Sequence, residues 1–397
     1  MAKKTETKQK NVKSRGNGDG SIYFNESRKC WIAQATVGRT ADGKPKRKAV
    51  YGKTKKEVKD KLDAIRNELK TGLYVEPSKI TISVFLLHLI DDDKAMNIIG
   101  DDTYLRKIGT YNRIKASPIA DVPLQAIQEY QIRDFLHTIT DFSDSVIRKD
   151  FELLKRCFRE AIHRDIIVKN PMYGMKCPKS TQKQEKTRAL TLAEQKRLLE
   201  VLTTHDVNYS VQMQLMLLTG LRMGEINALD VDDVNLDFKV LNVRRSLTRN
   251  LEEKTVIGKT TKTYAGERKI PLSAPAVALL RQYMKDGYTP NYENLLFWDK
   301  KGNKIITTNQ VNNQLIRTLK KYKVLDPTVP GKVTLHSLRH TYATRCIEAG
   351  MQAKVLQKLL GHTDIKVTMN TYCDAFSEFQ EENIEKFEQY LLEKKLS

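Results

Sequence analysis

After a charged stretch without apolar periodicity, three short segments that contain apolar residues are followed by a helical pattern. "SIYFNES", "KCWIAQATVG" and "KPKRKAVYG" are short segments with apolar and β-branched or aromatic residues between turn signals, which predicts three short strands. Asp42-Gly43 lies between the last two and favours a hairpin turn. Thr54 and Glu57 have the spacing of a helix capping box. The helix after them places apolar residues at helical spacing: Val58, Leu62, Ile65 and Leu69.

Helical spacing dominates the chain from Thr81 to about Lys176. "TISVFLLHLI", "EYQIRDFLHTI" and "SVIRKDFELLKRCFREAIHRDIIV" each predict a helix. The last of these can place six apolar residues on one face: Val146, Phe151, Leu154, Phe158, Ile162 and Ile166. We expect "KNPM" to stop this helix, because Asn170 precedes Pro171 and is pushed out of helical geometry. Pro77 marks the other boundary, which predicts an all-α domain over residues 78–176.

Residues 177–188, "CPKSTQKQEKTR", lack apolar periodicity and carry several lysines, so we interpret them as a linker. A last domain, 189–397, begins at "LTLAEQKRLLEVL" and ends in a tail with five apolar residues at helical spacing: Phe376, Phe379, Ile384, Phe387 and Leu391. The expected fold is multidomain α+β. It comprises a three-stranded sheet with one helix (1–75, including a basic N-terminal tail), the all-α domain, and a mainly helical domain with a small antiparallel sheet.

The strongly basic composition of the chain indicates what kind of partner it binds. The chain has 69 Lys and Arg against 48 Asp and Glu, a net charge of +21, and its first 70 residues hold 20 basic and 8 acidic side chains. Ribosomal and membrane-surface proteins are as basic, but a basic front end on a globular body favours nucleic acid. A strand face could enter a DNA groove, or could be a solvated basic surface. The side chains that would make this contact are Arg39, Lys44, Lys46, Arg47 and Lys48.

Several classes of protein do not fit the composition. No apolar run reaches the roughly 18 residues of a membrane-spanning helix. The opening "MAKKTETKQK" lacks the apolar stretch of a secretory signal, which predicts a protein of the cytoplasm. Five cysteines have no CxxC spacing, so we expect free thiols, no disulfide and no metal site.

Candidate chemistry begins in "LMLLTGLRMGEINAL", residues 215–229. Gly220 can end one helix in left-handed geometry. Arg222 would then fall in the first turn of the next helix, where free backbone N–H groups favour an anion. Glu225 lies three residues on and could hold the guanidinium in place. Alone, such a pair is usually a surface ion pair.

A second cluster lies in "TLHSLRHTYATRCIEAG", residues 334–350. His336 and Arg339 are three residues apart on one helical face, and Gly350 is a plausible stop.

The third stretch is "LLGHTDIKVTMNTYCD". A helix is expected to end at Gly361, the chain to turn through His362, and a new helix to start near Asp364. Tyr372 would then lie about two turns into the new helix. Taken singly, the histidines of these stretches are more often capping or core residues.

Taken together, two arginines, two histidines, a lysine and a tyrosine suit a phosphodiester. Arginine matches phosphate oxygens with paired donors, and fixed cations can stabilise the charge that develops in the transition state. A two-metal nuclease would need clustered carboxylates, whereas only Glu225 is near. A tyrosine nucleophile therefore fits best. Lys262, in "GKTTKTYAGERKIPLS" (258–273), could protonate the leaving oxygen. Lys259, Lys262, Arg268 and Lys269 could equally form a solvated hairpin that contacts phosphates.

Five of these stretches resemble, in order and spacing, the active-site boxes of the tyrosine recombinases, or phage integrase family: "TGLRMGE", "TKTYAGERKIPL", "HSLRHTYAT", "LLGH" and "TMNTY". The resemblance implies that Arg222, His336 and Arg339 bind and activate the scissile phosphate. It also implies that His362 assists and that Tyr372 forms a 3′-phosphotyrosine, without metal or other cofactor.

The resemblance further implies that Lys262 protonates the leaving 5′ oxygen. The gap from Lys262 to Pro271 is one residue longer than in many relatives.

The other domains extend the resemblance. "FREAIHRDIIVKNP" is similar to the family's core-binding domain, and "WIAQATVG" and "GKTKKEV" are similar to the arm-binding domain of integrases from Tn916-type conjugative transposons. This implies an integrase that inserts and excises a mobile element, acting on core and arm sites of double-stranded DNA in the bacterial nucleoid.

The resemblance also implies how copies of the chain assemble on DNA. It implies a homotetramer in which each protomer passes its C-terminal helix to the neighbouring protomer. The alternative is that this helix docks on its own domain. An excisionase or a DNA-bending protein would be a further partner. Two other functions stay open from sequence: a type IB topoisomerase-like nicking-closing enzyme, and a DNA-binding regulator without catalysis.

Overall fold

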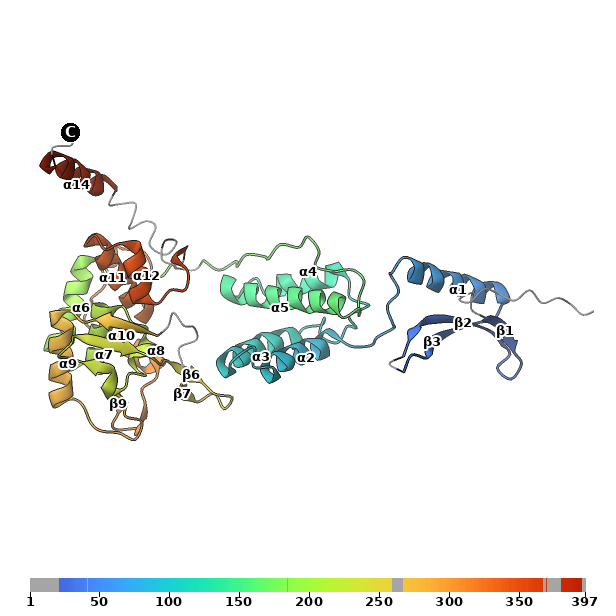
Figure 1. Ribbon diagram of the computed structural model, residues 1–397, viewed down its shortest axis with the longest axis horizontal. Helices are drawn as coiled ribbons and strands as arrows, with labels where there is room; N and C mark the ends of the chain where they lie inside the picture. Colours follow the sequence, from blue (N-terminus) through green and yellow to red (C-terminus); the bar gives the residue numbers. More distant parts are fainter. Residues whose placement is uncertain are drawn as a thin grey trace, which may run out of the picture. The chain divides into compact units, whose positions relative to one another are not determined.

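The computed structural model describes residues 21–394, apart from residues 41, 184, 259–266, 367–368 and 370–379 (Figure 1). The chain divides into two compact units. One contains the chain up to Asp92 together with Ile108–Thr181, and the other contains Asp93–Lys107 together with the chain from Gln182 onward. The fold is multidomain α+β, as predicted. Lys262, Phe376 and Phe379, and with them the basic N-terminal tail, lie outside the described residues.

The first unit begins with the predicted antiparallel sheet, in the order β1-β2-β3. Its strands are β1 (Ser21–Asn25), β2 (Cys30–Arg39) and β3 (Pro45–Gly52), and α1 (Lys55–Lys70) packs on one face. Gly43 has φ +76° in the hairpin turn. Thr54 caps α1 by accepting from the Glu57 N–H at 3.2 Å, but the Glu57 carboxylate accepts from Lys53 rather than from Thr54. One of the two bonds of the predicted capping box is therefore present, and in the other the donor is the Lys53 N–H instead of the Thr54 N–H.

Four helices follow. They are α2 (Ile82–Ala95), α3 (Asp101–Lys115), α4 (Glu129–Thr138) and α5 (Asp144–His163). Three of them lie in the segments predicted to be helical, and α3 is an addition. Val146, Ile162 and Ile166 of the predicted α5 face are only half-buried. The fully enclosed face is rotated to Ile147, Leu154, Phe158 and Ala161.

The expected stop of α5 at "KNPM" is wrong, because the helix ends at His163. Asp165 takes a left-handed conformation (φ +53°), and the Ile166 N–H returns to the Ala161 carbonyl at 2.8 Å. This local turn closes the helix before Asn170 is reached, and it buries Ile167.

The residues interpreted as a linker are bonded at both ends. The Thr181 N–H donates to the Thr140 carbonyl at 2.9 Å in the first unit. In the second unit, the Lys186 carbonyl accepts from the Lys332 N–H at 3.0 Å, and Thr187 forms a parallel bridge with Lys332. Only a short stretch between residues 181 and 186 joins these two bonded ends.

The second unit is mainly helical with a small antiparallel sheet, as predicted. The sheet has the order β4-β5-β8, and two hairpins, β6-β7 and β9-β10, stand apart from it. The strands are β4 (Val234–Asn235), β5 (Val240–Val243), β6 (Leu247–Arg249), β7 (Thr255–Ile257), β8 (Arg268–Pro271), β9 (Trp298–Asp299) and β10 (Lys304–Ile305). The strands on either side of "GKTTKTYAGERKIPLS" do not pair with each other, since β7 pairs with β6 and β8 with β5.

Within this unit α7 (Ser210–Thr219) is buried on nearly every side. The other helices are α6 (Leu192–Thr204), α8 (Met223–Ile226), α9 (Ala274–Asp286), α10 (Thr308–Lys321), α11 (Leu335–Glu348), α12 (Ala353–Leu360) and α14 (Gln380–Glu393), with a short 3-10 turn at Val231–Asp233. Of these, α6, α8, α9 and α11 contact α7. Gly350 (φ +78°) follows the end of α11, and Gly361 (φ +66°) caps α12, both as predicted.

Three expectations about composition can be compared with the described part of the chain. No helix there is long and apolar enough to cross a membrane. Cys30, Cys157, Cys177 and Cys346 are free thiols, whereas Cys373 lies outside the described residues. Within the same limits, no three His, Cys, Asp or Glu side chains gather as a metal site would require.

Candidate active site

Arg222 stands where the chain breaks between two helices. α7 ends at Gly220, which has φ +65° and no room for a side chain, because a Cβ there would lie 2.3 Å from the Tyr342 ring. Arg222 is the N-cap of the four-residue α8, not part of its first turn as expected. The predicted free N–H is also occupied, since the Arg222 N–H donates to the Glu225 carboxylate at 2.9 Å. The guanidinium remains exposed to solvent.

The Glu225 carboxylate is the buried acceptor of this region. It accepts from Arg222 Nη1 at 3.0 Å, as the sequence indicates, and from Arg268 Nη2 at 2.9 Å. Burial by itself raises the pKa of this carboxyl, but hydrogen bonding and charge from Arg268, followed by Arg222, outweigh burial and hold the pKa below its ordinary value. Glu225 therefore stays ionised and ties two guanidinium groups together.

Arg268 belongs to this network, although the sequence only places it in a solvated hairpin. Its side chain is 7% exposed, and its Nε donates to the Leu359 carbonyl at 2.8 Å. A Cβ on Gly361 would lie 2.9 Å from Arg268 Nη1, so glycine is needed there for space as well as for backbone conformation. The strand pattern could have predicted this burial. Arg268 lies two residues before the buried Ile270 on β8, and side chains two residues apart on a strand point to the same face.

Arg339 joins three segments of the unit. It is almost fully buried, and its two Nη atoms donate to the Gly220 carbonyl at 2.8 Å and to the Leu360 carbonyl at 2.6 Å. Nη2 also donates to His362 Nε2 at 2.9 Å. The ends of α7 and α12 are thus held against α11 by one fixed positive charge.

The histidines near this charge are held in their neutral form. Burial, followed by the charges of Arg339 and Arg222, lowers the pKa of His336 and takes that of His362 from 6.5 to about 4. His362 accepts from Arg339, which requires an unprotonated Nε2. His340 stacks edge-on against His336 with ring centroids 4.6 Å apart, and burial, followed by His336 and Arg339, lowers its pKa to about 4.

These pKa shifts predict that mild acid destabilises the second unit. The folded protein holds the imidazoles neutral, whereas the unfolded chain protonates them below pH 6.5, so stability present above that pH is lost as the pH falls towards about 4. We expect the thermal unfolding midpoint to drop between pH 7 and pH 5. His362→Gln, which keeps an acceptor for Arg339 but cannot titrate, should reduce that drop. Equal drops in the two proteins would contradict the assignment.

The described residues thus bring Arg222, Glu225, His336, Arg339 and His362 into one region, as the sequence indicates, and add Arg268. Asp364 begins the next turn by accepting from the Lys366 N–H at 2.9 Å, as expected of an N-cap. Lys262 and Tyr372 lie outside the described residues.

The cations predicted on the β-sheet of the first unit do not share one face. Because strand side chains alternate, Lys46 and Lys48 project to the side of Val50, where α1 packs, and Arg47 projects to the other. Lys46 pairs with Glu76 at 2.6 Å, and Lys48 Nζ lies 5.2 Å from the Tyr74 ring centroid. Arg47 is the exposed strand cation of the open face. The remaining two of the five, Arg39 and Lys44, flank the hairpin turn.

Several known proteins are similar to this chain. A profile of the phage integrase family matches residues 188–378. The chain is 28% identical over 376 residues to a tyrosine recombinase XerC-like protein of Caldanaerobacter subterraneus, covering 88% of this chain and 93% of that protein. The chain carries a phage integrase family domain over residues 188–378. It is a tyrosine-type site-specific DNA recombinase.

Two further relatives of this recombinase carry the comparison beyond the last domain. The transposase of transposon Tn916 from Enterococcus faecalis is 26% identical over 330 residues, which cover 80% of each chain. The integrase of transposon Tn1549, solved with transposon right end DNA, is 25% identical with a TM-score of 0.65, covering 76% of the recombinase and 99% of that chain. A lambda integrase dimer bound to a core site shares the fold at 19% identity and a TM-score of 0.57, with coverage of 90% and 96%.

Proposed function

We propose that this recombinase inserts and excises a mobile element, and that it cuts DNA by attack of Tyr372 on a phosphodiester held at the Arg222 region. The convergence of Arg222, Arg339 and His362 on one region, with His336 close enough to feel the charges of both arginines, carries this proposal. Arg222 and His336 are exposed and can reach a phosphate, while the enclosed Arg339 supplies fixed charge behind them. The similarity to the Tn916 transposase supports a mobile element as the substrate.

The chemistry divides among these side chains. The Tyr372 hydroxyl oxygen attacks phosphorus, the bond to the 5′ oxygen breaks, and a 3′-phosphotyrosine stores the bond energy for resealing. Lys262 gives its proton to the leaving 5′ oxygen. His362, neutral in the free protein, assists with its Nδ1–H, which can donate to a phosphate oxygen while Nε2 accepts from Arg339. The phenol proton passes to solvent water.

The domains divide the DNA contacts. We assign arm-site binding to residues 1–75, core-site binding to 78–176, a linker to 177–188 and catalysis to 189–397. In the first domain the open face of the sheet, opposite α1, carries Tyr23, Tyr51 and Arg47, which are exposed and suited to a groove. Lys46 and Lys48 would then contact phosphates only after leaving Glu76 and Tyr74.

Deleting residues 1–75 should abolish arm-site binding and spare cleavage at the core site. The reason is that the proposed catalytic side chains and the core-binding helices all lie beyond Pro77. Gel-shift titration with arm-site and core-site duplexes, together with adduct formation on the core site, measures both. Loss of core-site cleavage as well would mean that the domain division is wrong.

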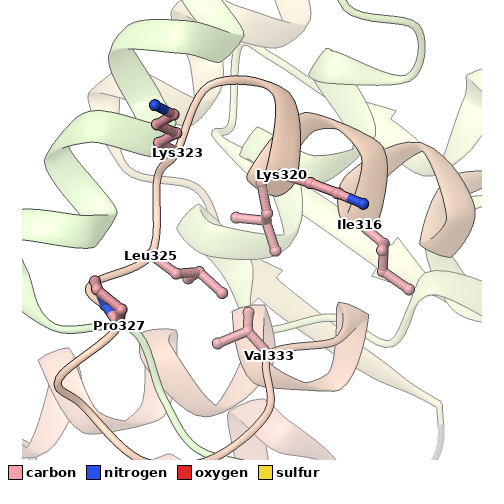
Figure 2. A pocket seen from close by; sticks show the side chains of 7 residues that line it. Ile316, Lys320, Lys323, Leu325, Pro327 and Val333 are labelled. Atoms are coloured by element: carbon pink, nitrogen blue, oxygen red, sulfur yellow. The ribbon is translucent and has the colours of Figure 1, made fainter.

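We assign the tetramer contact to the C-terminal helix of a neighbouring protomer. A cavity of about 460 Å³ lies between α10 and the loop after it, lined by Ile316, Leu319, Lys320, Lys323, Leu325, Pro327 and Val333 (Figure 2). Most of the lining side chains are apolar, and two lysines give the cavity a positive charge. The α14 segment has the opposite charge, with five glutamates against one lysine, and exposes Ile384, Phe387 and Tyr390. Apolar and charge complementarity favour α14 of a second copy as the occupant.

Charge reversal tests that assignment. Lys320→Glu with Lys323→Glu should weaken assembly of tetramers on a core-site duplex pair, measured by sedimentation, while single-site binding stays unchanged. Lys300→Glu with Lys301→Glu reverses two exposed lysines away from the cavity and serves as the matched control. Normal tetramers from the cavity variant would instead favour docking of α14 on its own domain.

A strand-exchange assay separates recombination from its rivals. Incubating the protein with two differently labelled core-site duplexes should give recombinant products. A type IB topoisomerase-like enzyme would relax and reseal DNA without exchanging duplexes, and a regulator would bind without cutting. The proposal also places the enzyme in the cytoplasm, at the nucleoid, with an excisionase or DNA-bending protein as a further partner.

A further inference from the structure

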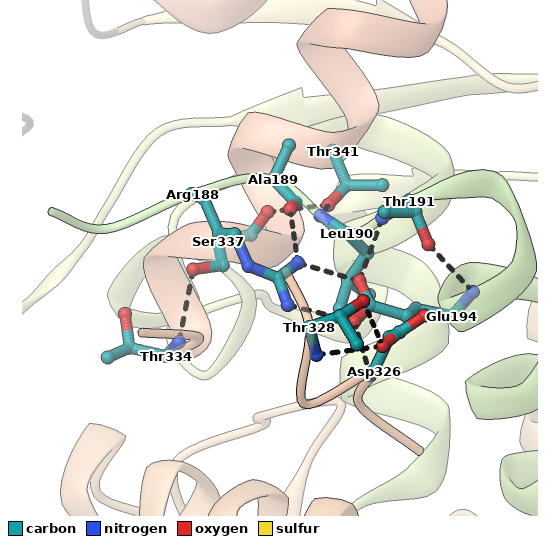
Figure 3. A network of polar contacts seen from close by, with 10 residues as sticks. All are labelled: Arg188, Ala189, Leu190, Thr191, Glu194, Asp326, Thr328, Thr334, Ser337 and Thr341. Carbon is teal, nitrogen blue, oxygen red and sulfur yellow. Dashed lines mark hydrogen bonds and ion pairs between the residues drawn. The ribbon is translucent and has the colours of Figure 1, made fainter. Parts of the chain in front are cut away.

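The chain enters the second unit through a segment that is built into its fold. This entry segment, residues 186–190, runs beside the loop that precedes α11 (Figure 3). The Arg188 N–H donates to the Lys332 carbonyl at 3.2 Å, and the Lys332 N–H donates to the Lys186 carbonyl at 3.0 Å. Gly331 has φ +107°, and a Cβ there would lie 2.8 Å from the Lys186 carbonyl oxygen. The approach is so close that a side chain at Gly331 would displace the entry segment.

Glu194 fastens the entry segment from the other side. Its carboxylate is fully buried and accepts two bonds from Arg188, from Nη1 at 2.6 Å and from Nη2 at 2.8 Å. It also accepts from the Thr191 N–H at 2.9 Å and from the Asp326 N–H at 2.8 Å. One carboxylate thus joins the entry segment, the start of α6 and the loop before α11 (Figure 3).

The entry segment ends against the helix that carries two proposed catalytic residues. The Leu190 N–H donates to Thr341 Oγ1 at 2.9 Å, and Thr341 Oγ1 donates to the Ser337 carbonyl at 2.8 Å. Both Thr341 and Ser337 are fully buried. Thr341 lies on α11, two positions after Arg339, so the bond from the entry segment holds the turn of α11 that carries Arg339.

We propose that Thr341 and Glu194 are positioning residues, through which the entry segment fixes the place of Arg339 and His336 in the active site. Neither side chain reaches the phosphate. Each acts by holding α11 against the segment through which the chain arrives from the first unit. This inference rests on the proposed function, because it assigns the scissile phosphate to Arg339 and His336.

Thr341→Val tests the link in the full chain, since it keeps shape but removes the acceptor for Leu190. We expect core-site binding to stay unchanged and the single-turnover rate of adduct formation to fall about 10–100-fold, as a displacement of about 1 Å can cause. Thr341→Ser, which restores the hydroxyl, should recover the rate. Thr318→Val, which removes another buried hydroxyl of the same unit, should cost no more than a few-fold.

A neutral substrate distinguishes positioning from general loss of structure. A methylphosphonate at the scissile position carries one negative charge less, so it depends less on a correctly placed Arg339. The deficit of Thr341→Val should shrink to a few-fold on that substrate, whereas a partly unfolded enzyme would be slowed equally on both. Equal slowing, or no slowing on the phosphodiester, would overturn the inference.

Gly331→Ala provides a second variant that leaves α11 untouched. It should reproduce the split between unchanged binding and slower cleavage, because its methyl group pushes against Lys186. Cleavage at the wild-type rate by both Gly331→Ala and Thr341→Val would sink the inference while leaving the proposed function intact. Absence of any adduct from the wild-type protein would instead count against the proposed function.

Discussion

Replacing Tyr372 with phenylalanine should abolish the covalent protein–DNA adduct and leave DNA binding intact. The substitution removes only the hydroxyl oxygen that would attack phosphorus, and the cations that bind the phosphate remain. On a nicked core-site duplex, whose short cleaved strand diffuses away, the wild-type protein should accumulate an adduct that denaturing electrophoresis resolves. The variant should form none above background.

Two controls make that result specific. Binding of the same duplex, measured by gel shift, should differ little between the variant and the wild-type protein. Tyr292→Phe removes an exposed phenol hydroxyl elsewhere in the same unit and should leave adduct formation unchanged. An adduct from Tyr372→Phe would show that another side chain is the nucleophile.

Replacing Arg222 with lysine should slow cleavage by about 10²–10³-fold, the scale seen when one donor to a developing oxyanion is lost. Lysine keeps the charge, but it cannot bond Glu225 and present two parallel donors to a phosphate at the same time. Binding should change little, because lysine keeps the charge and the chain has a net charge of +21. Single-turnover adduct kinetics and gel-shift titration measure the two effects separately.

The matched control is Arg244→Lys. Arg244, like Arg222, is an exposed arginine paired with a buried carboxylate in the same unit, here that of Asp233. Its replacement should leave the cleavage rate within a few-fold of wild type. If Arg222→Lys cleaves as fast as Arg244→Lys, the phosphate is held elsewhere.

The sequence predicts the elements that local rules determine. The strands β1 to β3, the cap at Thr54 and the left-handed stops at Gly220 and Gly361 follow from strand-forming segments, capping and glycine geometry, and all are confirmed. The end of α5 was missed, because the turn at Asp165 closes the helix before the proline signal at Asn170 can act.

In the candidate site, too, local patterns predict some residues and long-range packing determines others. His336 and Arg339 share a helix, so their spacing predicts a common face. The role of Arg268 depends on β8 meeting α8 and α12, a long-range arrangement that no local pattern contains. The cations near Lys46 are neighbours in sequence but not in space, because alternation along β3 places them on two faces of the sheet.

The central claim is that a pocket of positive side chains lets a phenol cut DNA. Its most direct test is to trap the adduct of the full-length wild-type protein on a nicked core-site duplex in the presence of EDTA, digest it, and locate the nucleotide-bearing peptide by mass spectrometry. We predict a 3′-phosphate linkage on Tyr372, formed at the same rate with or without the chelator. A linkage on any other residue, or cleavage that stops when metal is removed, would contradict the account.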